Sequence, residues 1–257
     1  MKKELQAFGS LLEIMDQLRE KCPWDSEQTI ESLRTLTIEE CYELTEAIID
    51  NDMLGVKEEL GDLLLHLVFY AKIGSENGDF DITDVIQTIN KKLIFRHPHI
   101  FGDTKVKDSE EVKENWEKLK LLEGKKTVLS GVPSSLPALI KAYRLQDKAR
   151  GIGFDWKEKS QVWEKVFEEV GELKKELSEN SESERTEEEF GDVLFSLINA
   201  GRLYGINPEN ALEKTNKKFI KRFTFLENEI SEKGLSLKEM SLEEMEVIWN
   251  KTKKLNL

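Results

Sequence analysis

The carboxylates best placed to do chemistry stand in two short patterns that each occur twice. E-E-x-x-E spans residues 39–43 and again 168–172, and E-x-x-D spans 59–62 and again 189–192. Residues three or four apart share a helix face, so each pattern points two carboxylates in one direction. Left alone, such groups repel one another and take up protons. Mg²⁺ prefers oxygen ligands and keeps positions open for water and phosphate. We therefore expect two metal sites, made of Glu40, Glu43, Glu59 and Asp62, and of Glu169, Glu172, Glu189 and Asp192.

One E-E-x-x-E is weak information in a chain with 51 acidic residues, and a third copy begins at Glu110 with no E-x-x-D after it. We give that copy no metal role. The other two differ because each precedes an E-x-x-D that opens an apolar stretch, where an unpaired carboxylate is costly to bury. The same order in both halves favours a functional site over a solvated helix face.

Basic and aromatic residues accompany these acids. Lys92 and Arg96 share a helix face, as do Lys218 and Arg222, and next to carboxylate sites they are candidates to bind phosphate rather than form surface ion pairs. Lys165 and Arg185 precede the second set of acids, where the first half has Leu36 and Gly55. The second half is therefore the better equipped. Trp249 is a candidate for stacking on a base, although core packing is its default role.

The elements that position these residues are predicted to be helices throughout. Apolar residues recur at steps of three and four over 4–20, which predicts an amphipathic helix. A second helix is expected over 36–50, with Thr35 or Thr37 as its N-cap. The stretch 56–74 is apolar nearly all round, which is typical of a core helix. Gly61 and Gly191, inside helical stretches, favour close helix packing over room for a ligand. No strand pattern flanked by hairpin turns occurs. The predicted fold class is all-α.

The two halves repeat each other in order. Besides the acidic patterns, N-K-K-L-I-F-R at 90–96 matches N-K-K-F-I-K-R at 216–222, and Trp24-Asp25 has an echo in Asp155-Trp156. A stretch rich in Gly, Ser and Pro covers 123–137. The prediction is a tandem duplication: a first module at 1–122, a linker at 123–137 and a second module at 138–257.

Composition limits the partners and the compartment. The 38 basic and 51 acidic residues give a net charge of −13, which disfavours binding to nucleic acid. No stretch reads as a membrane span or a signal peptide, and Cys22 and Cys41 do not form a disulfide framework or a zinc site. We expect a cytoplasmic protein that binds neither nucleic acid nor a membrane.

Taken together, these motifs resemble the MazG family of nucleoside triphosphate pyrophosphohydrolases. The resemblance covers nearly the whole chain as two modules and includes C-P-W-D at 22–25, R-H-P-H-I-F at 96–101 and G-F-D-W at 153–156. It implies the all-α NTP pyrophosphatase fold, a homodimer, dependence on Mg²⁺ with Mn²⁺ as a substitute, and hydrolysis of an NTP or dNTP to monophosphate and pyrophosphate. It also implies that the acids above bind the metal, and that substrate is bound by Lys165, Arg185, Glu188, Lys218, Arg222, Trp249 and Lys253, and in the first half by Lys92 and Arg96.

In the implied reaction, water attacks the α-phosphorus and pyrophosphate leaves. Glu168 and its counterpart Glu39 are candidates to orient or deprotonate that water. Each is adjacent in sequence to a predicted ligand and so does not share the ligand face, which makes a role in supporting the metal ligands an equal alternative. Three alternatives remain: a di-iron bundle, which lacks its E-x-x-H motifs here; a hydrolase with a narrower nucleotide range; and a helical binding module without catalysis.

Overall fold

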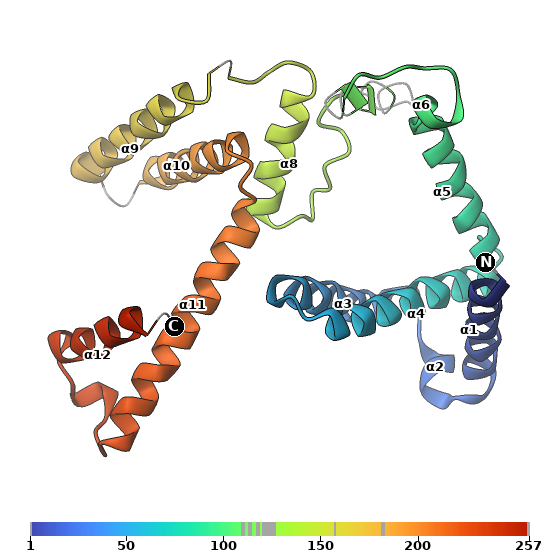
Figure 1. Cartoon of the computed structure of the whole chain (residues 1–257), viewed down its shortest axis with the longest axis horizontal. Helices are drawn as coiled ribbons and strands as arrows, with labels where there is room; N and C mark the ends of the chain where they lie inside the picture. The colour runs from blue at the N-terminus through green and yellow to red at the C-terminus, as the bar shows by residue number, and fades with distance from the viewer. Residues whose placement is uncertain are drawn as a thin grey trace. The chain divides into compact units, whose positions relative to one another are not determined.

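The structure is a computed structural model that describes residues 2–108, 111–112, 115–116, 119, 127–156, 158–180 and 183–255. In these ranges it contains helices and no strand, which confirms the predicted all-α class. The chain divides into two compact units, Met1–Lys107 and Asp108–Leu257 (Figure 1). The module limits at 122 and 137 stay a prediction, and part of the expected linker lies outside the described residues. No helix in the described part is long and apolar enough to cross a membrane.

The first unit is built on a helical hairpin. It comprises α1 (Lys2–Lys21), α2 (Pro23–Glu27), α3 (Ile30–Asp50), α4 (Met53–Asn77), α5 (Ile82–Arg96) and α6 (Pro98–Phe101). Helices α3 and α4 lie side by side (Figure 1), and α1 packs against α4. The core contains Met15 of α1, Leu33 of α3, and Val68, Phe69 and Ile73 of α4. This packing fixes the two helices that carry the first set of acids.

Helix α3 begins earlier than expected. Its N-cap is Thr29, which shares a reciprocal capping box with Ser32, so the prediction of Thr35 or Thr37 as cap is wrong. The hydroxyl of Thr37 instead lies inside the unit, 2.9 Å from Nδ1 of His66 and 2.7 Å from the Tyr70 hydroxyl. Because the helix starts at Ile30, Glu40 and Glu43 lie in its middle rather than near its start.

The second unit repeats the hairpin. It comprises α8 (Ala138–Arg150), α9 (Gln161–Asn180), α10 (Glu184–Leu203), α11 (Pro208–Glu232), the short 3₁₀ helix η1 (Leu237–Glu239) and α12 (Leu242–Lys254). Helices α9 and α10 lie side by side, α8 packs on α10, α11 contacts both α8 and α10, and α12 packs on α11 (Figure 1). Two small cores hold them: Val162, Val166 and Ala200, and Leu226, Ile230 and Ile248.

Both hairpins carry an exposed apolar stripe. On α4 it consists of Leu60, Leu64 and Leu67, which are 54%, 40% and 57% exposed, so the prediction that 56–74 is a core helix holds only for its C-terminal part. On α10 the matching positions are Phe190, Leu194 and Leu197. A Cβ added to Gly61 or Gly191 would meet no described atom within 4 Å. The close packing expected at these glycines is therefore wrong within the chain.

Candidate metal and nucleotide site

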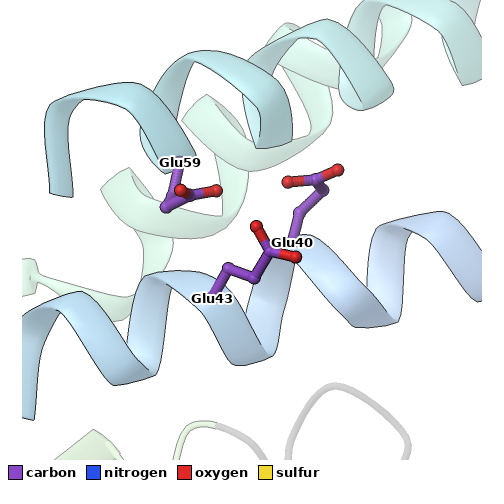
Figure 2. Close-up of side chains that lie close together, drawn as sticks. All are labelled: Glu40, Glu43 and Glu59. Carbon is purple, nitrogen blue, oxygen red and sulfur yellow. The ribbon is translucent and has the colours of Figure 1, made fainter. Parts of the chain in front are cut away.

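Three glutamates of the first unit converge between α3 and α4. Figure 2 shows Glu40 and Glu43 extending from α3, and Glu59 from α4, toward the same space. One oxygen from each lies within 4.8 Å of the others. Asp62 lies outside this group but is close enough for its charge to act on Glu40 and Glu59. The structure thus brings together three of the four predicted ligands and places the fourth nearby.

The proximity of these acids changes their protonation. Partial burial, followed by the charges of Asp62 and Glu43, raises the pKa of Glu40 above its usual range. Burial and the charge of Glu43 likewise raise the pKa of Glu59. The neighbouring carboxylates make Glu40 and Glu59 harder to ionise, as expected for like charges that share a site.

The second unit contains the matching group, Glu169, Glu172 and Glu189, again with one oxygen from each within 4.8 Å. Glu169 is only 7% exposed. Burial and the charge of Glu169 raise the pKa of Glu172. Asp192, the fourth predicted ligand, lines a cavity together with Glu169. The same trio is therefore assembled in both halves of the chain.

Two cations lie beside the second trio. Nζ of Lys165 lies 2.7 Å from Oε1 of Glu169 and 2.9 Å from Oε1 of Glu168. Hydrogen bonds to these two carboxylates raise the pKa of Lys165 well above its usual range, so it stays charged. Nε of Arg185 lies 3.8 Å from Oε1 of Glu189 and 3.5 Å from Oε2 of Glu176. Lys165 and Arg185, two of the residues predicted to bind phosphate, thus contact the acidic site directly.

The donor set of each trio suits a hard divalent cation. All the donors are carboxylate oxygens, the ligands that Mg²⁺ and Mn²⁺ take in proteins, and histidine and thiol groups are absent from both groups as described. A cation would also remove the repulsion that raises the pKa of Glu40, Glu59 and Glu172. The residues present therefore fit the expected metal.

The other predicted site residues are placed less directly. Glu39, Glu168 and Glu188 are exposed, next to the trios in sequence. Lys92, Lys218 and Lys253 are exposed, while Arg96 is buried, Arg222 is half-buried, and both engage other groups. The half-buried Trp249 packs against the core of α11 and α12, with its ring centroid 5.3 Å from that of Phe219. Lys218, Arg222, Trp249 and Lys253 are not among the described residues that line the cavity, so their substrate contacts stay a prediction.

A cavity of about 640 Å³ adjoins the second trio. It lies among α8, the segment before α9, and the helices α9 and α10. Lys165, Glu169 and Asp192 line it together with aromatic and aliphatic side chains and five polar residues that sequence reasoning did not single out as site residues: Gln146, Asp155, Ser196, Asn199 and Arg202. They come from separate segments, so no local spacing could have joined them. The one available signal in the sequence is G-F-D-W at 153–156, which contributes to the repeat and to the family resemblance but is assigned no site residue.

A paired charge holds that G-F-D-W segment against α10. Arg202 donates from Nη1 to Oδ2 of Asp155 at 3.0 Å and from Nη2 to Oδ1 at 2.5 Å. Its Nη2 also donates to Oδ1 of Asn199 at 2.8 Å. The Arg202 side chain is 5% exposed and that of Asp155 17%. This two-pronged contact fixes one wall of the cavity, because a planar guanidinium and a carboxylate match each other in geometry.

The chain is similar to a known family of nucleotide pyrophosphohydrolases over both of its halves. The MazG nucleotide pyrophosphohydrolase domain matches residues 28–101 and 157–224. The chain is 45% identical to the nucleoside triphosphate pyrophosphohydrolase/pyrophosphatase MazG of Thermotoga maritima, covering 98% of each chain. It is 40% identical to the nucleoside triphosphate pyrophosphohydrolase of Escherichia coli K12, covering 97% of this chain and 98% of that protein. A crystal structure of a mazG-related protein from Thermotoga maritima matches 44% of this chain and 98% of its own, at 31% identity and a TM-score of 0.40.

The domain matches contain both glutamate trios, one in each half, as the predicted duplication requires. The similarity to the two full-length relatives extends over nearly the entire chain, across both units. The chain therefore belongs to the MazG family of nucleotide pyrophosphohydrolases, with two MazG domains in tandem.

Proposed function

We propose that this protein hydrolyses nucleoside triphosphates, both NTPs and dNTPs, to the monophosphate and pyrophosphate in a Mg²⁺-dependent reaction, for which Mn²⁺ can substitute. The observation that carries the proposal is the second trio, where Glu169, Glu172 and Glu189 meet beside Lys165 and a nucleotide-sized cavity. Relatives that match nearly the whole chain are named for this activity. The proposed role is to cleanse the nucleotide pool in the cytoplasm.

In this proposal Glu169, Glu172, Glu189 and Asp192 hold the cation, which when bound neutralises phosphate charge and makes the α-phosphorus easier to attack. Lys165 and Arg185 exchange their carboxylate partners for phosphate oxygens, and their positive charge stabilises the charge that develops as pyrophosphate leaves. Lys218 and Arg222 contribute further phosphate contacts, and Glu168 orients the attacking water. Glu168 is suited to this role because its carboxylate, which accepts a hydrogen bond from Lys165 at 2.9 Å, lies beside the trio and is released for water when Lys165 turns to phosphate.

The first unit serves, in this proposal, mainly as scaffold. It keeps the predicted metal ligands Glu40, Glu43, Glu59 and Asp62, with Lys92 and Arg96 following on α5, but Leu36 and Gly55 occupy the positions of Lys165 and Arg185. Leu36 packs against the core of the unit, and a Cβ at Gly55 would lie 2.9 Å from Oδ2 of Asp52. The positions that hold Lys165 and Arg185 in the second unit are therefore occupied in the first unit by residues that take part in local packing.

We further propose that the protein is a homodimer, with the exposed stripes of α4 and α10 buried against a second copy. Leu64 and Leu194 are central in the two stripes, and contiguous exposed apolar patches of this kind mark association surfaces. Light scattering should give twice the chain mass of 29.8 kDa. Leu64→Glu and Leu194→Glu should shift the protein toward the monomer; a wild-type monomer would refute this assembly.

The activity itself is tested by pyrophosphate release from the eight common NTPs and dNTPs with Mg²⁺, with Mn²⁺, and with chelator. Hydrolysis in ¹⁸O-labelled water should place the label in the monophosphate, because water attacks the α-phosphorus. Glu189→Gln should lose activity, whereas the matched control Glu187→Gln, an exposed glutamate on the same helix, should keep it. Pyrophosphate release that is insensitive to chelator, or label in pyrophosphate, would contradict the proposal.

A further inference from the structure

Glu176 is a carboxylate at the edge of the second site that the proposed chemistry leaves without a role. It lies on α9, four residues after Glu172, and therefore on the same face of the helix. Its side chain is 14% exposed, although it does not belong to the trio. A carboxylate that is largely removed from water needs partners, and Glu176 has them on the next helix.

Both oxygens of Glu176 are engaged by residues at the start of α10. Ser183 donates a hydrogen bond from Oγ to Oε1 at 3.1 Å, and Nε of Arg185 lies 3.5 Å from Oε2. Ser183 is also the N-cap of α10, where its Oγ accepts from the backbone N–H of Thr186 at 3.1 Å. The hydroxyl thus joins the cap of α10 to Glu176, which fixes the carboxylate relative to the helix that carries Arg185.

Arg185 has a second carboxylate beside it, and the two partners differ. The Arg185 side chain is 71% exposed, and its Nε lies 3.8 Å from Oε1 of Glu189, a longer contact than the one to Glu176. Glu189 is a predicted metal ligand, so its charge is shared with the cation when the site is loaded, whereas Glu176 is not part of the trio. Glu176 can therefore hold the guanidinium at Nε throughout, while the N–H groups of Nη1 and Nη2 serve phosphate.

In the first unit, small residues occupy both positions. The register of the repeat places Ala47 at the position of Glu176 and Gly55 at that of Arg185. The two positions face each other there as well, because a Cβ added to Gly55 would lie 3.2 Å from the Cβ of Ala47. The chain has a carboxylate and a guanidinium together in one unit and two small residues together in the other, which indicates that the two positions work as a pair.

We propose that Glu176 is a positioning residue: its carboxylate, braced by Ser183, holds Arg185 so that the guanidinium meets a phosphate of the substrate beside the second trio. The inference rests on the proposed function and adds to it a residue that does not touch the substrate. In this refinement Arg185 gives up Glu189 when substrate binds and keeps Glu176. An exposed arginine without such a support would spread over many rotamers, and ordering it would cost part of the binding energy.

The test is a double-mutant cycle on pyrophosphate release from the best nucleotide. Glu176→Gln removes the charge but keeps an acceptor for Ser183, and it should lower kcat/KM about fivefold. Arg185→Met should lower it further, and adding Glu176→Gln to Arg185→Met should change nothing more, because the support then has no guanidinium to hold. Glu179→Gln, which replaces an exposed glutamate on the same helix, should match the wild type.

A general structural role would instead lower kcat/KM equally with and without Arg185, which would overturn the proposal. A wild-type value in Glu176→Gln, or a higher one, would also overturn it, since Glu176 would then be idle or would withhold Arg185 from phosphate. If Glu176→Gln does not fold, Glu176→Asp, which withdraws the charge by one methylene, decides through the same cycle.

Failure of the proposed function is recognised separately. If the wild type releases no pyrophosphate from any nucleotide, the proposed function fails, and calorimetric binding of inorganic tripolyphosphate with Mg²⁺ replaces the kinetics. Glu176→Gln should then weaken binding about fivefold in the wild-type background and leave it unchanged beside Arg185→Met. Equal binding by the wild type and Glu176→Gln, or no binding at all, would overturn the inference.

Discussion

Glu40, Glu43 and Glu59 in the first unit, and Glu169, Glu172 and Glu189 in the second, bring their oxygens equally close, within 4.8 Å in each case. Their surroundings differ. In the second unit Lys165 lies against Glu169, and Arg185 reaches Glu189. In the first unit Leu36 and Gly55 stand at those places. The comparison shows that two trios of the same geometry can have different residues at the positions of Lys165 and Arg185, so the trio alone does not tell the two units apart.

The units also differ behind the trio. On α10, Ser196 lines the cavity and Ala200 belongs to the small core beside it. The matching positions on α4 are His66 and Tyr70. The hydroxyl of Thr37 joins these two side chains, 2.9 Å from Nδ1 of His66 and 2.7 Å from the Tyr70 hydroxyl. The buried His66 has a lowered pKa because burial disfavours its charged form. Larger polar side chains thus form a closed network in the first unit at positions where the second has small residues. This supports nucleotide binding in the second unit.

The largest effect is expected from exchanging the cations. Lys165→Met should lower kcat/KM about 100-fold, because it removes a charge placed to stabilise the leaving phosphates. Leu36→Met, the matched change in the first unit, should leave kcat/KM within about twofold, since a volume-conserving apolar swap is tolerated. Steady-state pyrophosphate release measures both. Equal losses in the two variants would mean that the units share the chemistry.

The next effect concerns the segments that precede each hairpin. Arg202→Met would leave Asp155 mostly buried without its cation, at a cost of about 3 kcal/mol in the free energy of unfolding. In the first unit Arg19 pairs with Glu76 instead, at side-chain exposures of 12% and 35%, and donates to the backbone oxygen of Gln28. Glu76 can regain water when Arg19 is removed, but the bonds from Arg19 to the backbone oxygens of Asp25 and Ser26 are also lost, so Arg19→Met should cost about 2 kcal/mol. Urea unfolding compares the two; a larger loss for Arg19→Met would contradict the stronger anchoring of the second unit.

The smallest effect is a gain. Since the pKa of Glu59 is raised in the folded protein, the folded state holds more protons than the unfolded state above pH 4.5, and stability falls as pH rises through the raised pKa. Glu59→Gln should therefore raise the Tm slightly at pH 7 without metal, with no gain near pH 4. Glu189→Gln, which removes the partner of Arg185, should give no gain at either pH. A thermal scan in chelator at both pH values checks this, and a gain for both variants would remove the contrast.

Local patterns predict the helices, the repeat and two clusters of four acids, of which three meet in each unit, because period and spacing act within a few turns. Helical period alone does not predict the start of α3, because the cap at Thr29 depends on its reciprocal bonds with Ser32. Thr37, which the sequence offers as a cap, instead lies inside the unit next to His66. The packing proposed for Gly61 was wrong because the face beside it is open within the chain. Gln146, Asp155 and Arg202 could not be predicted as a group, since α8, a loop and the end of α10 meet only in the folded unit.

The most direct test of the central claim, that the second unit carries the catalytic site, is pyrophosphate release by Glu172→Gln and Glu43→Gln in otherwise intact protein. The two residues occupy the same place in the two trios, and each substitution removes one ligand charge at constant size. We predict that Glu172→Gln loses nearly all Mg²⁺-dependent release, while Glu43→Gln keeps at least about half of it. Loss in Glu43→Gln with activity retained in Glu172→Gln would contradict the account.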